Sequence, residues 1–165
     1  MKTTSLFITG LLILSIMGIS LADTSDYGAL GALDKTDYTL EEMLTYAIQD
    51  EYTALAEYEL ILSEYGNIRP FTNIAKAETT HISLLEPLFE TYGFELPKNE
   101  SNDIVMLPDT LYEAYKTGVQ AEIDNIAMYD AFLSKDLPTD VEKAFESLKN
   151  ASENHLKAFE RQVSK

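Results

Sequence analysis

Hydrophobic residues recur at alternating intervals of three and four along four long stretches of the chain, which is the spacing of an amphipathic α-helix. The stretches cover residues 40–65, 70–92, 108–133 and 138–159. In the first stretch the apolar positions are Leu44, Ile48, Leu55, Tyr58, Leu62 and Tyr65. The pattern predicts an all-α fold of four helices, each with one face turned to a common core.

Start and stop signals set the ends of these helices. Thr39 followed by Glu42 is a capping box, and Gly66 is a matching helix stop. Pro70 suits the first position of the second helix, and Gly93 ends it. A second capping box, Thr139 with Glu142, is predicted to start the fourth helix. Within the second helix, Pro87 is expected to bend the last turns without interrupting the fold.

The lengths of the connections predict how the helices are arranged. Two connections are short turns, whereas residues 94–107 form a longer, polar one. Two helical hairpins joined by a crossover loop make a four-helix bundle, and we assign residues 39–165 to this domain. Residues 23–38 lack a sustained period and are rich in Gly, Asp, Ser and Thr, so they are expected to be a flexible lead-in.

Five ionisable residues interrupt the apolar faces. Glu51 lies on the first helix, Glu78 and His81 share a face of the second, and Glu122 and His155 lie on the third and fourth. At ~1.5 Å per residue, all five fall roughly 15–25 Å from the same end of the bundle. They are therefore expected to meet in one layer in the middle of the bundle.

Such a layer has two interpretations. The two histidines could be ordinary core residues bonded to Glu78 and Glu51, in a buried polar layer that fixes how the helices pack. Alternatively, the layer binds metal, because three buried carboxylates need positive charge and the apolar faces offer no Lys or Arg. The second interpretation is favoured. Oxygen and nitrogen ligands without thiolate suit iron, manganese or zinc.

These residues resemble the ferritin-like superfamily of carboxylate-bridged dimetal proteins, in which Glu, Glu-x-x-His, Glu and Glu-x-x-His come from successive helices. More closely, the chain is similar to the ferritin-like family catalogued as domain of unknown function 2202. The similar segments are Asp50-Glu51-Tyr52 through Tyr58, Tyr65-Gly66-Asn67, Asn73 through His81, Glu122 through Ala127, and Ser152-Glu153-Asn154-His155-Leu156-Lys157-Ala158-Phe159. They extend over residues 40–162.

The resemblance implies metal ligands at Glu51, Glu78, His81, Glu122 and His155. It implies two iron ions, with manganese, zinc or a single ion as alternatives. One departure matters, because Ser152 stands where the superfamily has a second Glu on the fourth helix. Water or Ser152 could fill the gap, or the site could be an asymmetric pair or a single ion. Four further residues are candidates to contact and orient these ligands: Tyr58, Asn125, Tyr129 and Ser152.

The leading functional hypothesis is a ferroxidase, oxidase or peroxide-reducing activity, with dioxygen or peroxide as the oxidant. Tyr58 and Tyr129 would then be hydrogen-bond donors or radical sites, although core packing alone also explains them. The alternative is an extracellular binding or surface protein with a structural metal ion or none. Storage inside a large shell lacks support, since no fifth helix of the cage-building kind is present in the sequence.

Residues 1–22 have the pattern of a secretory signal peptide, namely Lys2, an apolar stretch, and small residues before Asp23. The expected location is therefore secreted or extracytoplasmic, including attachment to the cell surface, with a membrane anchor if the signal is retained. Asn99, in Asn99-Glu100-Ser101, is a candidate for N-glycosylation. The chain has no cysteine, so no disulfide supports it.

The composition narrows the choice of partners. At 165 residues and 45% hydrophobic composition, the chain suits a single domain with one sizeable core. Its formal charge is −16, and no basic patch is visible that could neutralise a phosphate backbone. Nucleic acid is therefore not an expected partner, whereas metal ions are. The sequence does not specify an oligomeric state.

Overall fold

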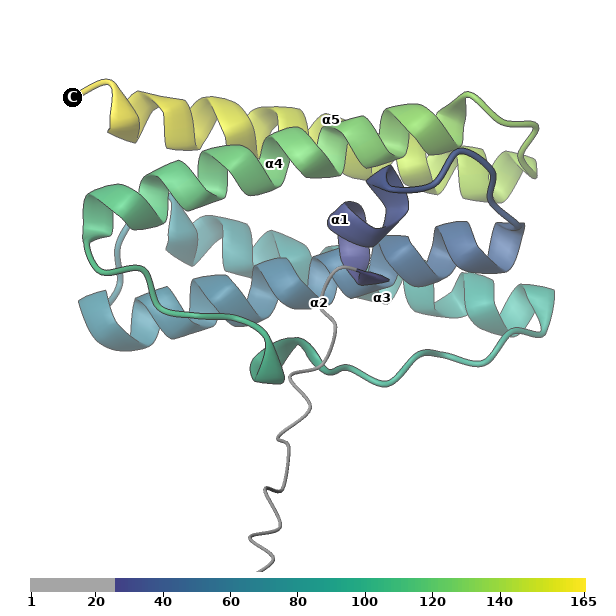
Figure 1. The fold of residues 1–165 in the computed structure, drawn as a ribbon, viewed down its shortest axis with the longest axis horizontal. Helices are drawn as coiled ribbons and strands as arrows, with labels where there is room; N and C mark the ends of the chain where they lie inside the picture. The colour runs from purple at the N-terminus through teal and green to yellow at the C-terminus, as the bar shows by residue number, and fades with distance from the viewer. Residues whose placement is uncertain (1–25) are drawn as a thin grey trace, which may run out of the picture.

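A computed structural model describes residues 26–165 of the chain, and this part is entirely helical, without a strand. Four of its helices are long, and they lie side by side with a short helix on their surface (Figure 1). The helices are α1 (Gly28–Leu33), α2 (Leu40–Tyr65), α3 (Phe71–Tyr92), α4 (Leu111–Leu133) and α5 (Thr139–Val163), and the 3₁₀ turn η2 covers Ser101–Asp103. The all-α prediction is confirmed. The proposed signal peptide, residues 1–22, lies outside the described residues.

The long helices pack as two hairpins. Helix α2 packs mainly on α3, and α4 packs mainly on α5. The segment after α3 then runs back along the bundle to the start of α4, as Figure 1 shows, and it carries η2 on the way. The chain is therefore a helical bundle with one long connection between its two halves. Within residues 26–165, no helix combines the length and apolar character needed to cross a bilayer.

Most helix ends fall at the predicted signals. Thr39 and Glu42 form the reciprocal capping box at the start of α2. Gly66 and Gly93 end α2 and α3 with positive φ angles of 74° and 71°, a conformation that glycine adopts at little cost. Helix α3 continues through Pro87 as far as Tyr92.

The capping box predicted for the fourth helix is wrong. Helix α5 already includes Thr139, and the residue before it, Pro138, makes no side-chain cap. The nearby carboxylate of Asp140 instead accepts hydrogen bonds from the phenol of Tyr92 at 2.6 Å and from the backbone N–H of Val141 at 3.0 Å. This carboxylate satisfies one of the free backbone donors of the first turn.

The segment expected to be a flexible lead-in contains helix α1. Its first backbone N–H groups donate to side chains of α2, Gly28 to Gln49 at 3.2 Å and Ala29 to Asp50 at 2.8 Å. Ala29 and Ala32 are buried, and α1 packs on both α2 and α4. Because α1 has only six residues, it depends on these contacts and not on a periodic pattern of its own.

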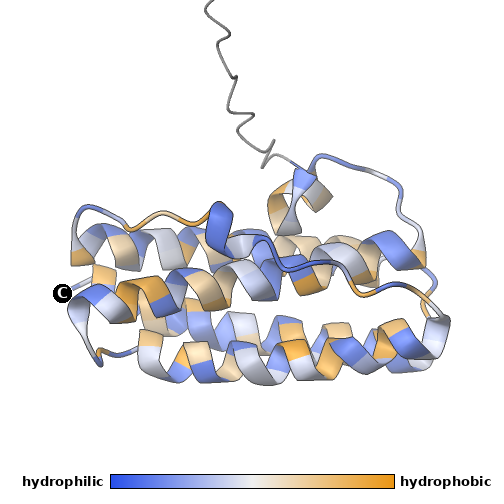
Figure 2. Cartoon of the chain, turned by 90° about the horizontal axis from the view of Figure 1, so that it is seen from below, coloured by the Kyte–Doolittle hydropathy of each residue, from blue (hydrophilic) through white to orange (hydrophobic). Residues whose placement is uncertain are grey.

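Within residues 26–165, the core has two hydrophobic clusters with the ionisable layer between them. One cluster includes Leu44, Phe132 and Phe145, and the other includes Phe71 and Phe159. In Figure 2 hydrophobic and hydrophilic residues alternate along each long helix, as expected for helices with one buried face. The ionisable layer is thus enclosed by apolar packing on two sides.

One glycine brings α4 and α5 unusually close together. A Cβ atom placed on Gly118 would lie 2.8 Å from the ring of Phe159, which is closer than carbon atoms approach in proteins. Phe159 is fully buried and packs against Tyr58 and Phe71. Gly118 is one helical turn before Glu122, so this contact helps to set the helix spacing beside the ionisable layer.

Candidate metal centre

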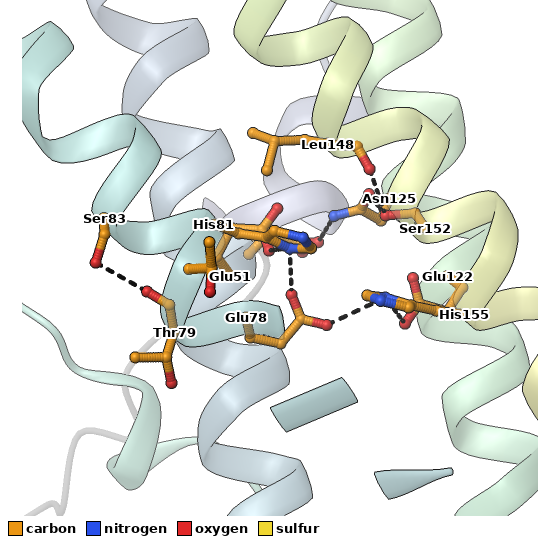
Figure 3. A network of polar contacts seen from close by, with 12 residues as sticks. Glu51, Glu78, Thr79, His81, Ser83, Glu122, Asn125, Leu148, Ser152 and His155 are labelled. Atoms are coloured by element: carbon orange, nitrogen blue, oxygen red, sulfur yellow. Dashed lines mark hydrogen bonds and ion pairs between the residues drawn. The ribbon is translucent and has the colours of Figure 1, made fainter. Parts of the chain in front are cut away.

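The structure brings the five predicted ligands together in the middle of the bundle. Glu51 comes from α2, Glu78 and His81 from α3, Glu122 from α4 and His155 from α5. The three glutamates are 2–4% exposed, and the two imidazole side chains are 11% and 12% exposed. Figure 3 shows the side chains converging from all four long helices. We refer to these five residues as the Glu/His cluster.

The first half of the cluster is built around His81. Its Nδ1 atom lies 3.0 Å from Oε2 of Glu51 and 2.6 Å from Oε2 of Glu78. One ring nitrogen carries at most one hydrogen, so it cannot donate a good hydrogen bond to both carboxylates. These three side chains converge closely enough to hold a metal ion, with one ligand atom from each lying within 4.8 Å of the others.

The second half is built around His155. Its Nδ1 atom lies 3.3 Å from Oε1 of Glu78 and 3.4 Å from Oε1 of Glu122. Neither contact has hydrogen-bond geometry, and this nitrogen is a buried polar atom without a partner in the described chain. Glu78, Glu122 and His155 form a second group that could hold an ion. Glu78 belongs to both groups, one oxygen facing each imidazole, as Figure 3 shows.

Two tyrosines cross the bundle to the outer carboxylates. The phenol of Tyr129 donates to Oε1 of Glu51 at 2.7 Å, and that of Tyr58 donates to Oε1 of Glu122 at 3.1 Å. Each tyrosine lies seven residues after a cluster glutamate on its own helix and reaches the glutamate of the other helix. Burial, followed by the negative charge of nearby glutamates, raises the pKa of both phenols well above its usual value, so they remain protonated.

Ser152, the residue in place of a fourth glutamate, is hydrogen bonded away from the imidazoles. Its hydroxyl donates to Oδ1 of Asn125 at 2.7 Å, and Nδ2 of Asn125 donates to Oδ2 of Asp50 at 2.6 Å. The predicted neighbours Asn125 and Ser152 therefore both line the cluster. Sequence reasoning missed Asp50, because it lies one position away from the apolar face of α2.

Burial and mutual contacts shift the pKa values of the cluster residues. Burial and the negative charge of Glu78 raise the pKa of Glu51 to about 8. Burial alone would lower the pKa of His81, but its contacts with Glu51 and Glu78 raise it to about 10. His155 likewise reaches about 9 through Glu122 and Glu78. Burial opposes the charge on Glu78, yet its contacts with the two imidazoles lower its pKa to about 2.

The charge balance of the cluster favours a cation. With both imidazoles protonated, three carboxylates still leave one excess negative charge, and no Lys or Arg among residues 26–165 pairs with them. In the metal-free protein, a proton held by the cluster supplies the balance. A metal ion would replace such protons with a larger positive charge at the point where ring nitrogens and carboxylate oxygens converge.

The glycosylation candidate lies away from the cluster. Asn99 is exposed in the connection between α3 and α4, just before η2. Its side-chain oxygen accepts hydrogen bonds from the backbone N–H and the hydroxyl of Ser101, at 3.0 and 2.6 Å. Its exposure is compatible with the predicted modification.

Fold and site together define a helical-bundle protein with a buried carboxylate and imidazole cluster that could hold metal. The chain is 27% identical over 132 residues to uncharacterized protein MJ0754 of Methanocaldococcus jannaschii, covering 71% of each chain. It also resembles the crystal structure of hypothetical protein MJ0754 from Methanococcus jannaschii, with a TM-score of 0.65 and 24% identity over 79% of this chain and 83% of that one. The structural likeness supports the bundle fold. No known protein-family profile matches the chain.

Proposed function

We propose that this chain is an exported ferritin-like protein whose Glu/His cluster binds two iron ions and oxidises Fe(II) with dioxygen or peroxide. The observation that carries the proposal is the position of Glu78. Its two oxygens face His81 and His155 separately, at 2.6 and 3.3 Å. A carboxylate placed between two groups of ligands is suited to bridge a pair of metal ions.

The residues present fit such a pair of ions. His155 has a buried Nδ1 atom near two carboxylate oxygens but without a hydrogen bond, and a metal ion bound there would give this atom a partner. The cluster also has an excess of carboxylates over imidazoles, so cations would relieve its negative charge. Nitrogen and oxygen ligands without sulfur suit iron, with manganese or zinc as alternatives.

Bound iron would supply the one-electron chemistry that dioxygen or peroxide requires. The protein's own contribution is to hold the ligands and keep the site dry. Tyr129 and Tyr58 fix the orientation of Glu51 and Glu122, and their protonated phenols place a hydrogen atom at each outer carboxylate. The two hydrophobic clusters exclude water from both sides of the layer.

The order of ligands along the chain supports the ferritin-like assignment. Glutamate, Glu-x-x-His, glutamate and Ser-x-x-His come from α2, α3, α4 and α5 in turn. Each half has two glutamates and one histidine, with Glu78 shared, so the serine leaves the pair with one bridging carboxylate where the superfamily pattern has a further glutamate. An asymmetric pair or a single ion is therefore the natural variant of the proposal.

A second candidate function is an extracellular binding or surface protein in which the ion is structural or absent. Ser152 favours it, because its hydroxyl is engaged by Asn125 and leaves one ligand position of the superfamily pattern unfilled. A structural ion needs fewer open positions than a reactive one. Export remains part of both candidates, and it predicts that the chain recovered from the medium or cell surface begins at Asp23.

Metal content and oxygen uptake test the proposal. The protein is expressed in iron-supplemented medium, its metals are measured, and oxygen consumption is followed after Fe(II) is added. We expect about two ions per chain, lost in Glu78→Ala, His81→Ala, and retained in the surface control Glu90→Gln. A metal-free wild type would refute the proposal. Bound iron without oxygen uptake, together with a lower melting temperature after chelation, would favour the structural role.

A further inference from the structure

A groove of about 510 Å³ opens on the outside of the bundle beside the Glu/His cluster. It lies between α1, α2, the end of the connection before α4, and α4 itself. Its wall includes Leu30, Thr53, Met106 and Thr117, one from each of these parts. The apolar parts of the wall are contributed mainly by α1 and the connection, whereas α2 contributes polar side chains.

Two carboxylates of α2 line this groove. Asp50, Thr53 and Glu57 are spaced three and four residues apart, so they share one side of the helix. None of the residues that line the groove is basic. Burial raises the pKa of Asp50 to about 6, and burial with the nearby charge of Asp50 raises that of Glu57 to about 7. Asp50 accepts hydrogen bonds from Ala29 and Asn125, whereas no hydrogen bond to the Glu57 carboxylate is found within residues 26–165, and a carboxylate without a partner is costly to bury.

A second, much smaller space lies inside the cluster. It measures about 10 Å³, roughly the room for a single water molecule or ion, and it is lined by Glu51, Glu78 and Glu122. Asp50 lines this inner space as well as the outer groove. Its side chain is therefore the wall between solvent and the proposed metal site, held by Asn125 on one oxygen and Ala29 on the other.

The opposite side of the cluster is less suited to admit a cation. There, the rings of His81 and His155 stack with their centroids 5.6 Å apart and are slightly exposed. The stacked rings cover this side of the cluster. The side of Asp50 and Glu57 has an open groove with carboxylates, which would attract an approaching cation.

We propose that the groove is the entrance through which divalent cations reach the Glu/His cluster, with Glu57 and Asp50 as successive transient ligands. The inference rests on the proposed metal binding. A hydrated ion entering the groove first exchanges water for the Glu57 carboxylate, then for that of Asp50, and then reaches the inner space. Each carboxylate offsets part of the cost of removing the ion's water.

The test measures the rate of Co²⁺ uptake by the metal-free full chain in a stopped-flow absorbance experiment, with final Co²⁺ content measured separately. Glu57→Gln removes charge from the groove at a side chain outside the cluster. Thr53→Phe keeps the charge but fills the groove with a ring. Glu90→Gln removes the same charge from an exposed position on α3 and serves as the control. Melting curves of each variant confirm that it is folded.

We expect Glu57→Gln and Thr53→Phe to slow uptake by at least about threefold with unchanged final content, while Glu90→Gln matches the wild type. Added salt should slow the wild type more than Glu57→Gln. If folded Glu57→Gln and Thr53→Phe both load at the wild-type rate, the entrance lies elsewhere, although metal binding itself stands. A wild type that takes up no Co²⁺ would refute both proposals.

Discussion

The phenol of Tyr129 on α4 donates a 2.7 Å hydrogen bond to the carboxylate of Glu51 on α2. The reverse contact runs from Tyr58 on α2 to Glu122 on α4 at 3.1 Å. Helices α2 and α4 thus exchange phenol and carboxylate contacts across the core. A carboxylate held by such a donor is oriented before a metal ion arrives, which is the usual effect of residues surrounding metal ligands.

Replacing Tyr129 by Phe should weaken metal binding while preserving the packing of the ring. The loss of a hydrogen bond to a ligand typically lowers metal affinity by about 10–100-fold. Tyr58→Phe should have a smaller effect, because its contact with Glu122 is longer. Calorimetric titration with Mn²⁺ measures both affinities. Equal affinities for Tyr129→Phe and wild type would show that the phenol has no part in binding.

The number of bound ions should depend on which carboxylate is removed. Glu122→Gln alters only the His155 half, so one ion per chain is expected to remain in the His81 half. Glu78→Gln alters both halves and should abolish stoichiometric binding. Elemental analysis of the purified variants gives the count. Two ions per chain in Glu78→Gln would contradict the shared role of this carboxylate.

Metal affinity should rise with pH. In the metal-free protein, pKa values of about 10 for His81, 9 for His155 and 8 for Glu51 mean that these groups hold protons at neutral pH. A metal ion must displace those protons, so binding strengthens as pH increases from 6 to 8, by about tenfold per pH unit for each proton released. Calorimetry in buffers of different ionisation enthalpy counts the protons. Binding without proton release would be inconsistent with this charge balance.

The groove carboxylate Glu57 should reduce the stability of the metal-free protein at high pH. Burial raises its pKa from 4.5 to about 7, so the folded state binds its proton more tightly than the unfolded state. The contribution of this carboxyl group to the free energy of unfolding is therefore fully present below pH 4.5, and it is lost as the pH rises through 7. Glu57→Gln should be the more stable protein at pH 8 in urea unfolding, with a smaller difference at pH 5.

Other acidic residues near Glu57 also contribute to the pH dependence of stability. Asp50 on α2 has its own raised pKa of about 6, and Asp109 lines the groove from the connection before α4. Asp50 will leave a residual pH dependence in the variant. Glu90→Gln provides the control for loss of one surface charge. A wild type that equals Glu57→Gln in stability at pH 8 would show that Glu57 is well solvated.

Replacing Gly118 by Ala should destabilise the fold. The added methyl group would meet the ring of Phe159 at 2.8 Å, and overpacking of this kind costs about 1–3 kcal/mol. Urea unfolding measures the loss. The double variant Gly118→Ala, Phe159→Leu should recover part of it, since the smaller side chain vacates the contact. Thr117→Ala, at an exposed neighbouring position, serves as the control.

The cluster residues could be predicted from the sequence because they break a regular pattern. Glu51 and Glu122 occupy positions where the helix period calls for an apolar side chain, and both are buried. Their distances from the helix ends then placed them at one depth, which needed only the rise per residue of a helix. The number of residues between His155 and the start of its helix predicts the same depth, and His155 lies beside Glu122.

The groove could not be predicted in this way. Asp50 and Glu57 lie beside the apolar face of α2, where acidic residues are usually solvated. They are covered because α1 and the connection before α4 pack over them, and neither segment has a hydrophobic period. Long-range packing of short, irregular segments leaves no local signal, although the small residues of Gly28-Ala29-Leu30-Gly31-Ala32 suggest a close approach of backbones.

The separation of the core into two apolar clusters has a consequence for how this scaffold can evolve. Each end of the bundle is packed by its own aromatic and aliphatic side chains, so the shape of the molecule does not depend on the chemistry halfway along it. A descendant that exchanged the acids and imidazoles for well-fitting apolar residues would keep the same architecture, since such replacements of buried ionic groups are often neutral or stabilising. The proposed metal binding could thus be gained, altered or lost while the fold stays the same.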